Sequence, residues 1–264
     1  MKTRLTSKMY RTISLLVSAV CFAVSVALAE TVNPATTPVF HPLTANHFED
    51  MRAVAKKGEA SLVFLGDDTF GYWTEDENKW HLQRGGLQNW TLTWGSRKAA
   101  NFGMAGDRTE HVLWRLDHGL MDGLKPKVIV LLIGMNNSVA QGNPVDESKN
   151  GEKYQCTPEQ TAKGIKAIIE RLKTRCPESK ILLLGIFPMF SRTYRCTPQG
   201  EATNAIIKDF ADERTVFYLE PGAKFMMSTG SVNIDLMPDG MHLNEVGYRI
   251  LGNEIMSKVQ ELMK

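Results

Sequence analysis

The sequence has few cysteines and no ligand spacing that is diagnostic of a metal site. Its 264 residues include four cysteines, and Cys21 is the first of them. A disulfide-rich small scaffold is therefore excluded, and a chain of this length can form a sizeable hydrophobic core without such cross-links. Internal repeats and low-complexity linkers are also absent, which favours one globular domain.

Long hydrophobic runs are scarce as well. The longest, Ile13–Val26, is short for a bilayer span and follows the basic residues Lys2, Arg4, Lys8 and Arg11. The small residues of Ala27-Leu28-Ala29 come next. This order predicts a signal peptide over residues 1–29, cleaved after Ala29, and hence a secreted or periplasmic protein with no stable membrane anchor.

Without residues 1–29, the chain has no excess of basic residues. The whole chain has 31 basic and 29 acidic residues, and removal of residues 1–29 leaves 27 against 29, a net charge of −2. No basic stripe remains, so nucleic acid is not predicted as a partner. The sequence does not indicate an oligomeric state.

The three remaining cysteines are Cys156, Cys176 and Cys196. Cys156 and Cys196 both lie in Tyr-x-Cys-Thr-Pro segments, each in a long loop after a predicted strand. In an oxidising compartment we expect these two to form a disulfide, with Cys176 as a free or buried thiol. Three unpaired cysteines are the alternative.

Strand and helix patterns alternate along the chain after an extended lead-in at residues 30–43. Continuous apolar runs such as Val128–Ile133 and Ile181–Ile186 are typical of strands covered on both faces. The pattern predicts an α/β fold over residues 44–264: a three-layer α/β/α sandwich with a five-stranded parallel sheet, flavodoxin-like in plan. Predicted strands are 61–66, 99–102, 128–134, 181–187 and 216–220, and predicted helices are 45–57, 110–117, 158–175, 201–213 and 244–263.

Polar clusters follow several of these strands. Three of them are Asp67-Asp68, the stretch 101–109 that contains Gly106, and Gly134-Met135-Asn136-Asn137. A fourth polar cluster, the stretch 238–244 that contains Asp239 and His242, lies near the C-terminus before the last predicted helix. Each is compatible with ordinary turn chemistry alone. Together they offer a histidine oriented by an aspartate three residues earlier, plus backbone and amide donors for an oxyanion, as an acyl-transfer site requires.

These four blocks, in this order, resemble those of the SGNH (GDSL-type) hydrolases, and most closely the catalytic subunits of platelet-activating factor acetylhydrolase. The similarity extends through residues 101–116, 166–168 and 184–188 and covers most of residues 60–260. It implies the SGNH hydrolase fold and hydrolysis of carboxylic esters, such as short-chain acyl or acetyl esters, including those on glycans. It implies no cofactor and no metal.

The resemblance also assigns roles to individual residues. Gly106 and Asn136 would be oxyanion donors together with the backbone N–H of residue 68, His242 the general base, and Asp239 its orienting partner. Asp67 would shape the turn. At the position of the nucleophile the family has Gly-Asp-Ser, whereas this chain has Gly66-Asp67-Asp68.

An aspartate at position 68 changes the chemistry that the site can perform. A carboxylate is a poor acyl acceptor, and Asp68 would lie in the donor pocket of Gly106 and Asn136 and raise the pKa of His242. Three hypotheses follow. The protein is an SGNH-fold binding module that has lost ester hydrolysis; or Asp68 attacks a saturated carbon or positions a water; or the aspartate replaces a serine that the natural enzyme has.

A metal site built from Asp67, Asp68, Asp107, Asp239 and His242 is a rival of another class, suited to magnesium, calcium or manganese. The indoles of Trp73, Trp80 and Trp90 are candidates for a carbohydrate or acyl pocket, with at least one of them in the core. The predicted partner is a small-molecule or glycan ester.

Overall fold

The computed structural model contains the predicted five-stranded parallel sheet, with strand order β2-β1-β3-β6-β7. Counted within this sheet, the order is 2-1-3-4-5, which is flavodoxin-like and reverses direction between β1 and β3. Ligand sites of such folds lie at this reversal, outside the carboxyl ends of the strands. The strands are β1 (Leu62–Gly66), β2 (Ala99–Gly103), β3 (Val128–Leu132), β6 (Lys180–Leu184) and β7 (Val216–Leu219).

The apolar character of the central strands follows from burial on both faces. In β1, Val63 and Leu65 belong to one hydrophobic cluster, whereas Leu62 and Phe64 belong to the cluster on the opposite face. Full burial of each such side chain contributes about 1.5–3 kcal/mol, so the sheet holds both helical layers.

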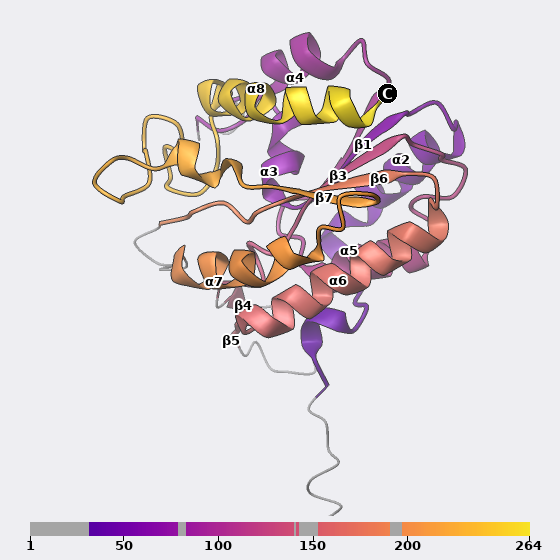
Figure 1. The fold of residues 1–264 in the computed structure, drawn as a ribbon, viewed down its shortest axis with the longest axis horizontal. Coiled ribbons are helices and arrows are strands. Elements are labelled where there is room, and N and C mark those ends of the chain that lie inside the picture. Colours follow the sequence, from indigo (N-terminus) through magenta and orange to yellow (C-terminus); the bar gives the residue numbers. More distant parts are fainter. Residues whose placement is uncertain (1–31, 79–82, 140, 143–152, 191–196) are drawn as a thin grey trace, which may run out of the picture. The chain divides into compact units, whose positions relative to one another are not determined.

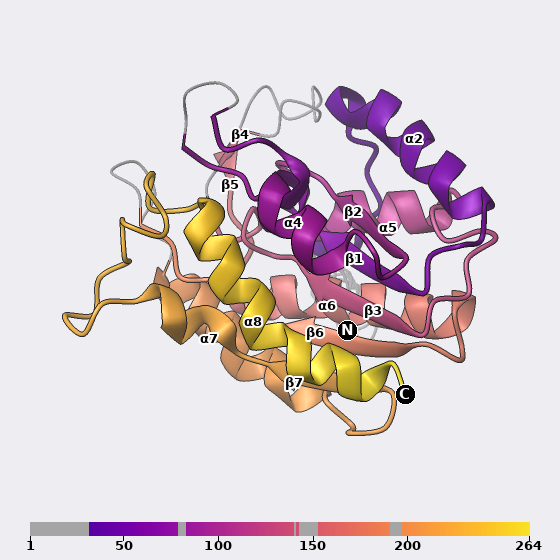
Figure 2. The same cartoon turned by 90° about the horizontal axis from the view of Figure 1, so that it is seen from above.

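Two helical layers cover the sheet, as Figures 1 and 2 show. The first cluster includes residues of α2, α5 and α6, and the second includes residues of α3, α4 and α8. The helices are α2 (Ala45–Lys56), α3 (Asp68–Gly71), α4 (Leu87–Trp94), α5 (Thr109–Asp117), α6 (Pro158–Arg175), α7 (Thr197–Ile207) and α8 (Glu245–Leu262). Short 3-10 turns are η1 (Pro34–Thr36), η2 (Pro42–Thr44), η3 (Tyr72–Thr74), η6 (Lys208–Phe210) and η7 (Pro221–Phe225), and β4 (Gln141–Gly142) pairs with β5 (Lys153–Tyr154).

Some boundaries differ from the sequence prediction. The helix expected over 201–213 starts at Thr197 and ends at Ile207. It cannot continue to residue 213 because the Asp212 carboxylate accepts hydrogen bonds from three following backbone N–H groups and turns the chain into β7. The short helices α3 and α4 were not predicted.

The structure describes residues 32–78, 83–139, 141–142, 153–190 and 197–264, and residues 34–264 form one compact unit. The predicted signal peptide lies outside the described residues and stays a prediction. The predicted lead-in is not simply extended, because it contains η1 and η2. No helix within the described ranges has both the length and the apolar character needed to cross a membrane.

The predicted disulfide is not formed in this structure, since Cys156 is a free, buried thiol. Its Sγ lies 3.3 Å from Arg108 Nη2 and 3.6 Å from Asn137 Nδ2, so the thiol is enclosed by hydrogen-bond donors of the domain interior. Cys196 lies outside the described residues. Cys176 is free and buried, as expected.

Tyr248 connects α8 to the turn after β1. Its buried phenol donates a hydrogen bond of 2.7 Å to the carbonyl of Thr69, and its ring stacks on Trp73 at 5.3 Å between centroids.

We expect Tyr248→Phe to lower the free energy of unfolding by about 1–3 kcal/mol, because the ring packing is kept while the buried carbonyl loses its donor. Urea unfolding measures this change, and Val246→Ala on an exposed position of α8 is the control, expected within about 0.5 kcal/mol of the native protein. An equal effect of both substitutions would contradict the role of the hydrogen bond.

Candidate active site

Asp68 lies where β1 ends, at the reversal of strand order. It is the first residue of α3, and Asp67 caps this helix by accepting a hydrogen bond of 3.4 Å from the Thr69 N–H. The expected role of Asp67 in shaping the turn is therefore confirmed. Asp68 is 7% exposed, so its carboxylate lies almost entirely out of water.

One oxygen of Asp68 occupies the pair of donors that the sequence had singled out. Asp68 Oδ2 accepts a hydrogen bond of 2.9 Å from the Gly106 N–H and one of 2.5 Å from Asn136 Nδ2. Gly106 has φ +79°, a conformation that glycine adopts without strain, and the turn over Met104–Asp107 directs its N–H at Asp68. Asn136 follows β3 and also donates to the Asp107 carbonyl at 3.0 Å.

The second oxygen of Asp68 faces His242. His242 Nε2 lies 3.5 Å from Asp68 Oδ1, an ion-pair distance that is longer than a well-formed hydrogen bond. On its other side, His242 Nδ1 donates to Asp239 Oδ2 at 2.6 Å. Asp239 Oδ1 accepts from the N–H groups of Met241 and His242, so a single turn fixes the carboxylate against the ring.

Charges within this group shift its pKa values strongly. Burial acts to lower the pKa of His242, but the hydrogen bond to Asp239 and the proximity of Asp68 outweigh it and raise the value to about 9. Burial acts to raise the pKa of Asp239, yet His242 lowers it to about 2. For Asp68 the opposing effects are burial and the contacts with His242, Asn136 and Gly106, and the net pKa is lowered. At neutral pH the site therefore holds an imidazolium between two carboxylates.

Asp67 differs from its neighbour in the direction of its pKa shift. Burial and the adjacent negative charge of Asp68 raise its pKa well above the ordinary value. Its Oδ2 is buried without a hydrogen-bond partner among the described residues, so the charged form of this carboxyl is costly.

Tyr72 and Arg84 form the rim beside His242. The Tyr72 ring contacts the His242 ring edge-on at 5.0 Å between centroids, and the Arg84 guanidinium lies over the Tyr72 ring at 4.2 Å. Arg84 Nη1 is also 3.9 Å from Asp239 Oδ2. Burial and the charge of Asp68 raise the pKa of Tyr72 to about 12, so it stays a neutral phenol.

The side chain of Asp107 turns away from this centre. It pairs with Arg115 Nη2 and lies 3.3 Å from His41 Nδ1 and 3.7 Å from His111 Nδ1. The carboxylate of Asp107 therefore does not join the other four residues considered for a metal site, Asp67, Asp68, Asp239 and His242. Burial, the largest effect, lowers the pKa of His111 to about 4 and keeps it neutral.

His41, Asp107 and His111 offer possible metal-ligand atoms that lie within 4.8 Å of one another. The two imidazole rings are stacked, with centroids 4.5 Å apart and planes at 14°. Imidazole binds a metal through a lone pair in the ring plane, and nearly parallel stacked rings do not direct both lone pairs at one ion. The Arg115 guanidinium on Asp107 further disfavours a cation. This group is a hydrogen-bonded support of the Gly106 loop.

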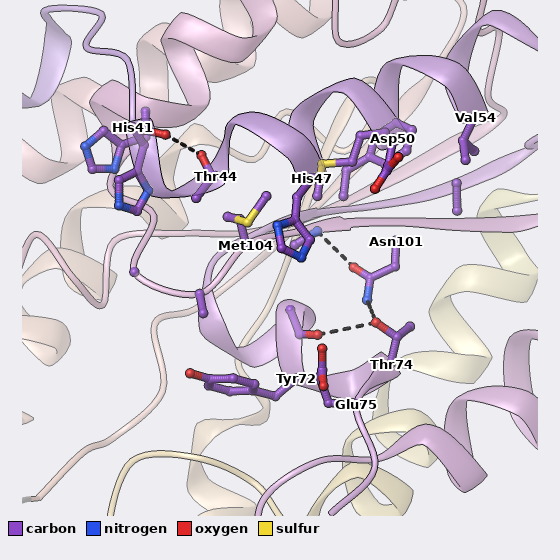
Figure 3. Close-up of a pocket in the computed structure, with 18 of the residues that line it drawn as sticks. His41, Thr44, His47, Asp50, Val54, Tyr72, Thr74, Glu75, Asn101 and Met104 are labelled. Atoms are coloured by element: carbon purple, nitrogen blue, oxygen red, sulfur yellow. Dashed lines mark hydrogen bonds between the residues drawn. The ribbon is translucent and has the colours of Figure 1, made fainter. Parts of the chain in front are cut away.

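A cavity of about 790 Å³ opens next to Gly106; its lining includes Gly106 and Tyr72 but not the side chains of Asp68, Asn136, Asp239 and His242. It runs along the edge strand β2, with α2 on one side and η3 on the other, and Figure 3 shows His47 and Asp50 facing Tyr72 and Glu75 across it, with Asn101 between them. Trp90 also lines it, whereas Trp73 is fully buried in the core and Trp80 lies outside the described residues. A cavity of this size and mixed polarity suits a small organic ligand.

The structure brings together all five residues that the sequence nominated: Asp68, Gly106, Asn136, Asp239 and His242. It adds Tyr72, Arg84 and His41, which were not nominated. Tyr72 follows Asp68 by four residues, the spacing of one helical turn, so recognition of α3 would have indicated it. Arg84 and His41 are distant in the sequence and have no comparable signal.

A flavodoxin-like sheet that carries an Asp-His pair and a pair of hydrogen-bond donors at its carboxyl edge is typical of a family of hydrolases. Residues 64–250 match the model of the GDSL-like Lipase/Acylhydrolase family, and the chain belongs to this family. A curated relative, the human platelet-activating factor acetylhydrolase IB subunit alpha2, is 30% identical over 79% of this chain and 80% of its own length.

Solved structures support the fold. A GDSL-like lipase from Bacteroides thetaiotaomicron superposes with a TM-score of 0.62 at 16% identity, covering 82% of this chain and 97% of that one. A carbohydrate acetylesterase from Sinorhizobium meliloti gives a TM-score of 0.55 at 16% identity, covering 77% and 99%.

Proposed function

We propose that this protein is a secreted ester-hydrolase scaffold in which Asp68 stands in place of the serine nucleophile and suppresses hydrolysis. The observation that carries the proposal is the double hydrogen bond of Asp68 Oδ2 with the Gly106 N–H and Asn136 Nδ2. In acyl transfer such donors stabilise the oxyanion of the tetrahedral intermediate. With a carboxylate already bound there, an ester carbonyl has no access to them.

The state of His242 supports the same conclusion. A general base must accept a proton, but His242 already carries two protons at neutral pH because Asp239 and Asp68 flank it. Attack by Asp68 on an acyl carbon would form a mixed anhydride, which is much higher in energy than an acyl-serine ester. Both the base and the nucleophile are therefore unsuited to ordinary ester hydrolysis.

The ligand that the site would bind is a small ester, including an acetylated glycan. The cavity beside Gly106 combines the aromatic rings of Tyr72 and Trp90 with the polar groups of Asn101, Asp50 and Glu75, which suits a hydroxylated alcohol portion. The curated relative is an acetylhydrolase and one structural neighbour is a carbohydrate acetylesterase, and these names favour a short acyl group.

A second candidate function uses Asp68 itself as the nucleophile. Its Oδ1 faces His242 and is not the oxygen that the donor pair holds. Oδ1 would attack a saturated carbon and expel a halide or open an epoxide, giving an alkyl ester of Asp68. The alkoxide formed from an epoxide would take its proton from the His242 imidazolium. Esterification also removes the charge of Asp68, one cause of the raised His242 pKa, so the ring becomes able to act as a base. Neutral His242 would then take a proton from a water that adds to the Asp68 carboxyl carbon, and the departing alkoxide would take up this proton and leave as the alcohol. Haloalkanes and epoxides, with mass spectrometry of the intact protein, test this candidate, and a covalent mass increase that Asp68→Asn abolishes would support it.

The main proposal is tested by comparing hydrolysis of short-chain acyl esters by the native protein and by Asp68→Ser. Strong activity in the serine variant alone supports a suppressed hydrolase. Equal activity in both proteins would contradict the blocking role of Asp68.

A further inference from the structure

The segment before α2 is attached firmly to the start of α5. The Val39 N–H donates to the Glu110 carbonyl at 3.1 Å, and Thr109 Oγ1 donates to the Ala35 carbonyl at 2.8 Å. The Phe40 ring packs against Trp114 with centroids 4.6 Å apart. This segment is therefore part of the domain.

The side chain of His41 in this segment reaches the Gly106 loop, where its Nδ1 lies 3.3 Å from Asp107 Oδ1. Its carbonyl accepts hydrogen bonds from the Thr44 N–H at 3.0 Å and from Thr44 Oγ1 at 2.7 Å, which fix its backbone. Its ring is buried, and Cε1 lies 3.5 Å from the position that a Cβ on Gly106 would take. The imidazole thus lies on the side of Gly106 where a side chain would be.

The hydrogen bond of His41 to Asp107 can be assigned a direction. His111 Nδ1 accepts a hydrogen bond of 3.1 Å from the Arg108 N–H, so the proton of this neutral ring is on Nε2. His111 therefore has no proton to give to Asp107 Oδ1. The ring donor toward Asp107 Oδ1 is His41 Nδ1–H, at 3.3 Å.

Asp107 transmits this contact to both oxyanion donors. It directly follows Gly106, and its carbonyl accepts the hydrogen bond of 3.0 Å from Asn136 Nδ2. Arg115 holds the other carboxylate oxygen, and the Asp107 N–H closes the turn on the Met104 carbonyl at 3.1 Å. A shift of Asp107 would move the Gly106 N–H and the Asn136 amide together.

We propose that His41 is a positioning residue of the oxyanion-donor pair, acting through its Nδ1–H hydrogen bond to Asp107. Any effect of His41 on ester hydrolysis rests on the proposed function. Its effect on the position of the Gly106 N–H does not, and it can be measured in the native protein. The segment before α2, which the sequence suggested as a mere lead-in, then becomes a component of the site.

Hydrogen exchange of the Gly106 amide, followed by NMR in the native protein, is the direct test. His41→Phe keeps an aromatic ring against His111 but lacks the donor, and His41→Asn places an amide N–H near the position of Nδ1. We expect Gly106 exchange to accelerate by about ten-fold or more in His41→Phe and to return toward the native rate in His41→Asn. His47→Ala, which removes another imidazole from the same cavity wall, is the matched control and should leave this rate unchanged.

Retained protection of Gly106 in His41→Phe would overturn the positioning role, and so would loss of protection in both His41→Phe and His41→Asn. In the Asp68→Ser background, kcat for a short-chain ester should fall by a similar factor in His41→Phe and recover in His41→Asn. An inactive Asp68→Ser protein would contradict the proposed function alone, because the exchange measurement does not depend on hydrolysis. An unprotected Gly106 amide in the native protein would contradict both.

Discussion

The Asp68→Ser variant is expected to hydrolyse short-chain acyl esters at least about 10³-fold faster than the native protein. Loss of the nucleophile from a serine triad costs about 10⁶ in rate, and a remaining oxyanion hole and binding site retain roughly 10³–10⁴ over water. The native protein should lie below even that residual level, because Asp68 Oδ2 fills the donor pair itself.

The substitution removes three obstacles at once. Serine supplies a hydroxyl at the end of β1, the Gly106 N–H and the Asn136 amide become available to an ester carbonyl oxygen, and His242 loses one of its two flanking carboxylates. With Asp239 alone beside it, the pKa of His242 should fall toward the range in which imidazole is a base near neutral pH. The gain therefore includes a pH profile that rises as His242 is deprotonated.

Two further variants separate these effects. Asp68→Asn removes the charge but supplies no nucleophile, so it should stay inactive toward esters. Asp68→Ser combined with His242→Gln should lose most of the gained activity, since a serine hydroxyl without a base is a weak nucleophile. Full activity in the combined variant would contradict the assignment of His242 as the base. Native activity equal to that of Asp68→Ser would contradict the proposal that Asp68 suppresses hydrolysis.

The topology of the sheet explains why the sequence predicted correctly that the site residues lie together. Parallel strands bring their carboxyl ends to one edge, so Asp68 after β1 and Asn136 after β3 had to lie close together. Asp239 and His242 are three residues apart, and Gly240, with φ +78°, allows the turn that brings them together. The proximity of Asp68 to Asn136 follows from strand order, and that of Asp239 to His242 follows from their short separation. Both can therefore be predicted from the sequence.

Contacts that depend on docking of distant segments could not be predicted in this way. His41 and Asp107 are 66 residues apart, and no periodicity or motif connects them. The disulfide prediction was wrong for a related reason. The Tyr-x-Cys-Thr-Pro repeat suggested a pair, but Cys156 lies inside the domain against Arg108 and Asn137. The helix α4 was missed because its sequence is rich in tryptophan and threonine, which have modest helix propensity.

The second large expected effect is a loss of stability at alkaline pH. The pKa of His242 rises from an ordinary value of 6.5 to about 9 in the folded protein. A raised histidine pKa contributes stability that is fully present below pH 6.5 and is lost as the pH rises through about 9. At 1.36 kcal/mol per unit, the loss between these values is about 3 kcal/mol, and the imidazole is only 10% exposed, so solvent screens it little.

The Asp68→Asn variant isolates the part of this effect that the central carboxylate causes. It removes one of the two charges that raise the pKa of His242. It also removes one cause of the raised pKa of Asp67, and a raised pKa of Asp67 likewise makes the fold less stable as the pH rises. The decline between pH 6.5 and 9 should therefore be smaller in the variant than in the native protein. Urea unfolding at several pH values measures it, and NMR titration of the His242 ring gives the pKa directly.

The comparison is restricted to pH 6–9.5 because the ionisation of Tyr72, with a pKa raised to about 12, would add its own loss above that range. The His47→Gln variant, which removes an imidazole outside the ion-paired group, is the control, and its stability curve should match that of the native protein. At low pH the stability changes in the opposite direction with pH because of Asp68. Its lowered pKa stabilises the fold above about pH 4, and this stabilisation is lost as the pH falls and the carboxylate is protonated. Identical stability curves for native and Asp68→Asn proteins, with an unchanged His242 titration, would show that Asp68 does not form the ion pair that helps to keep His242 protonated.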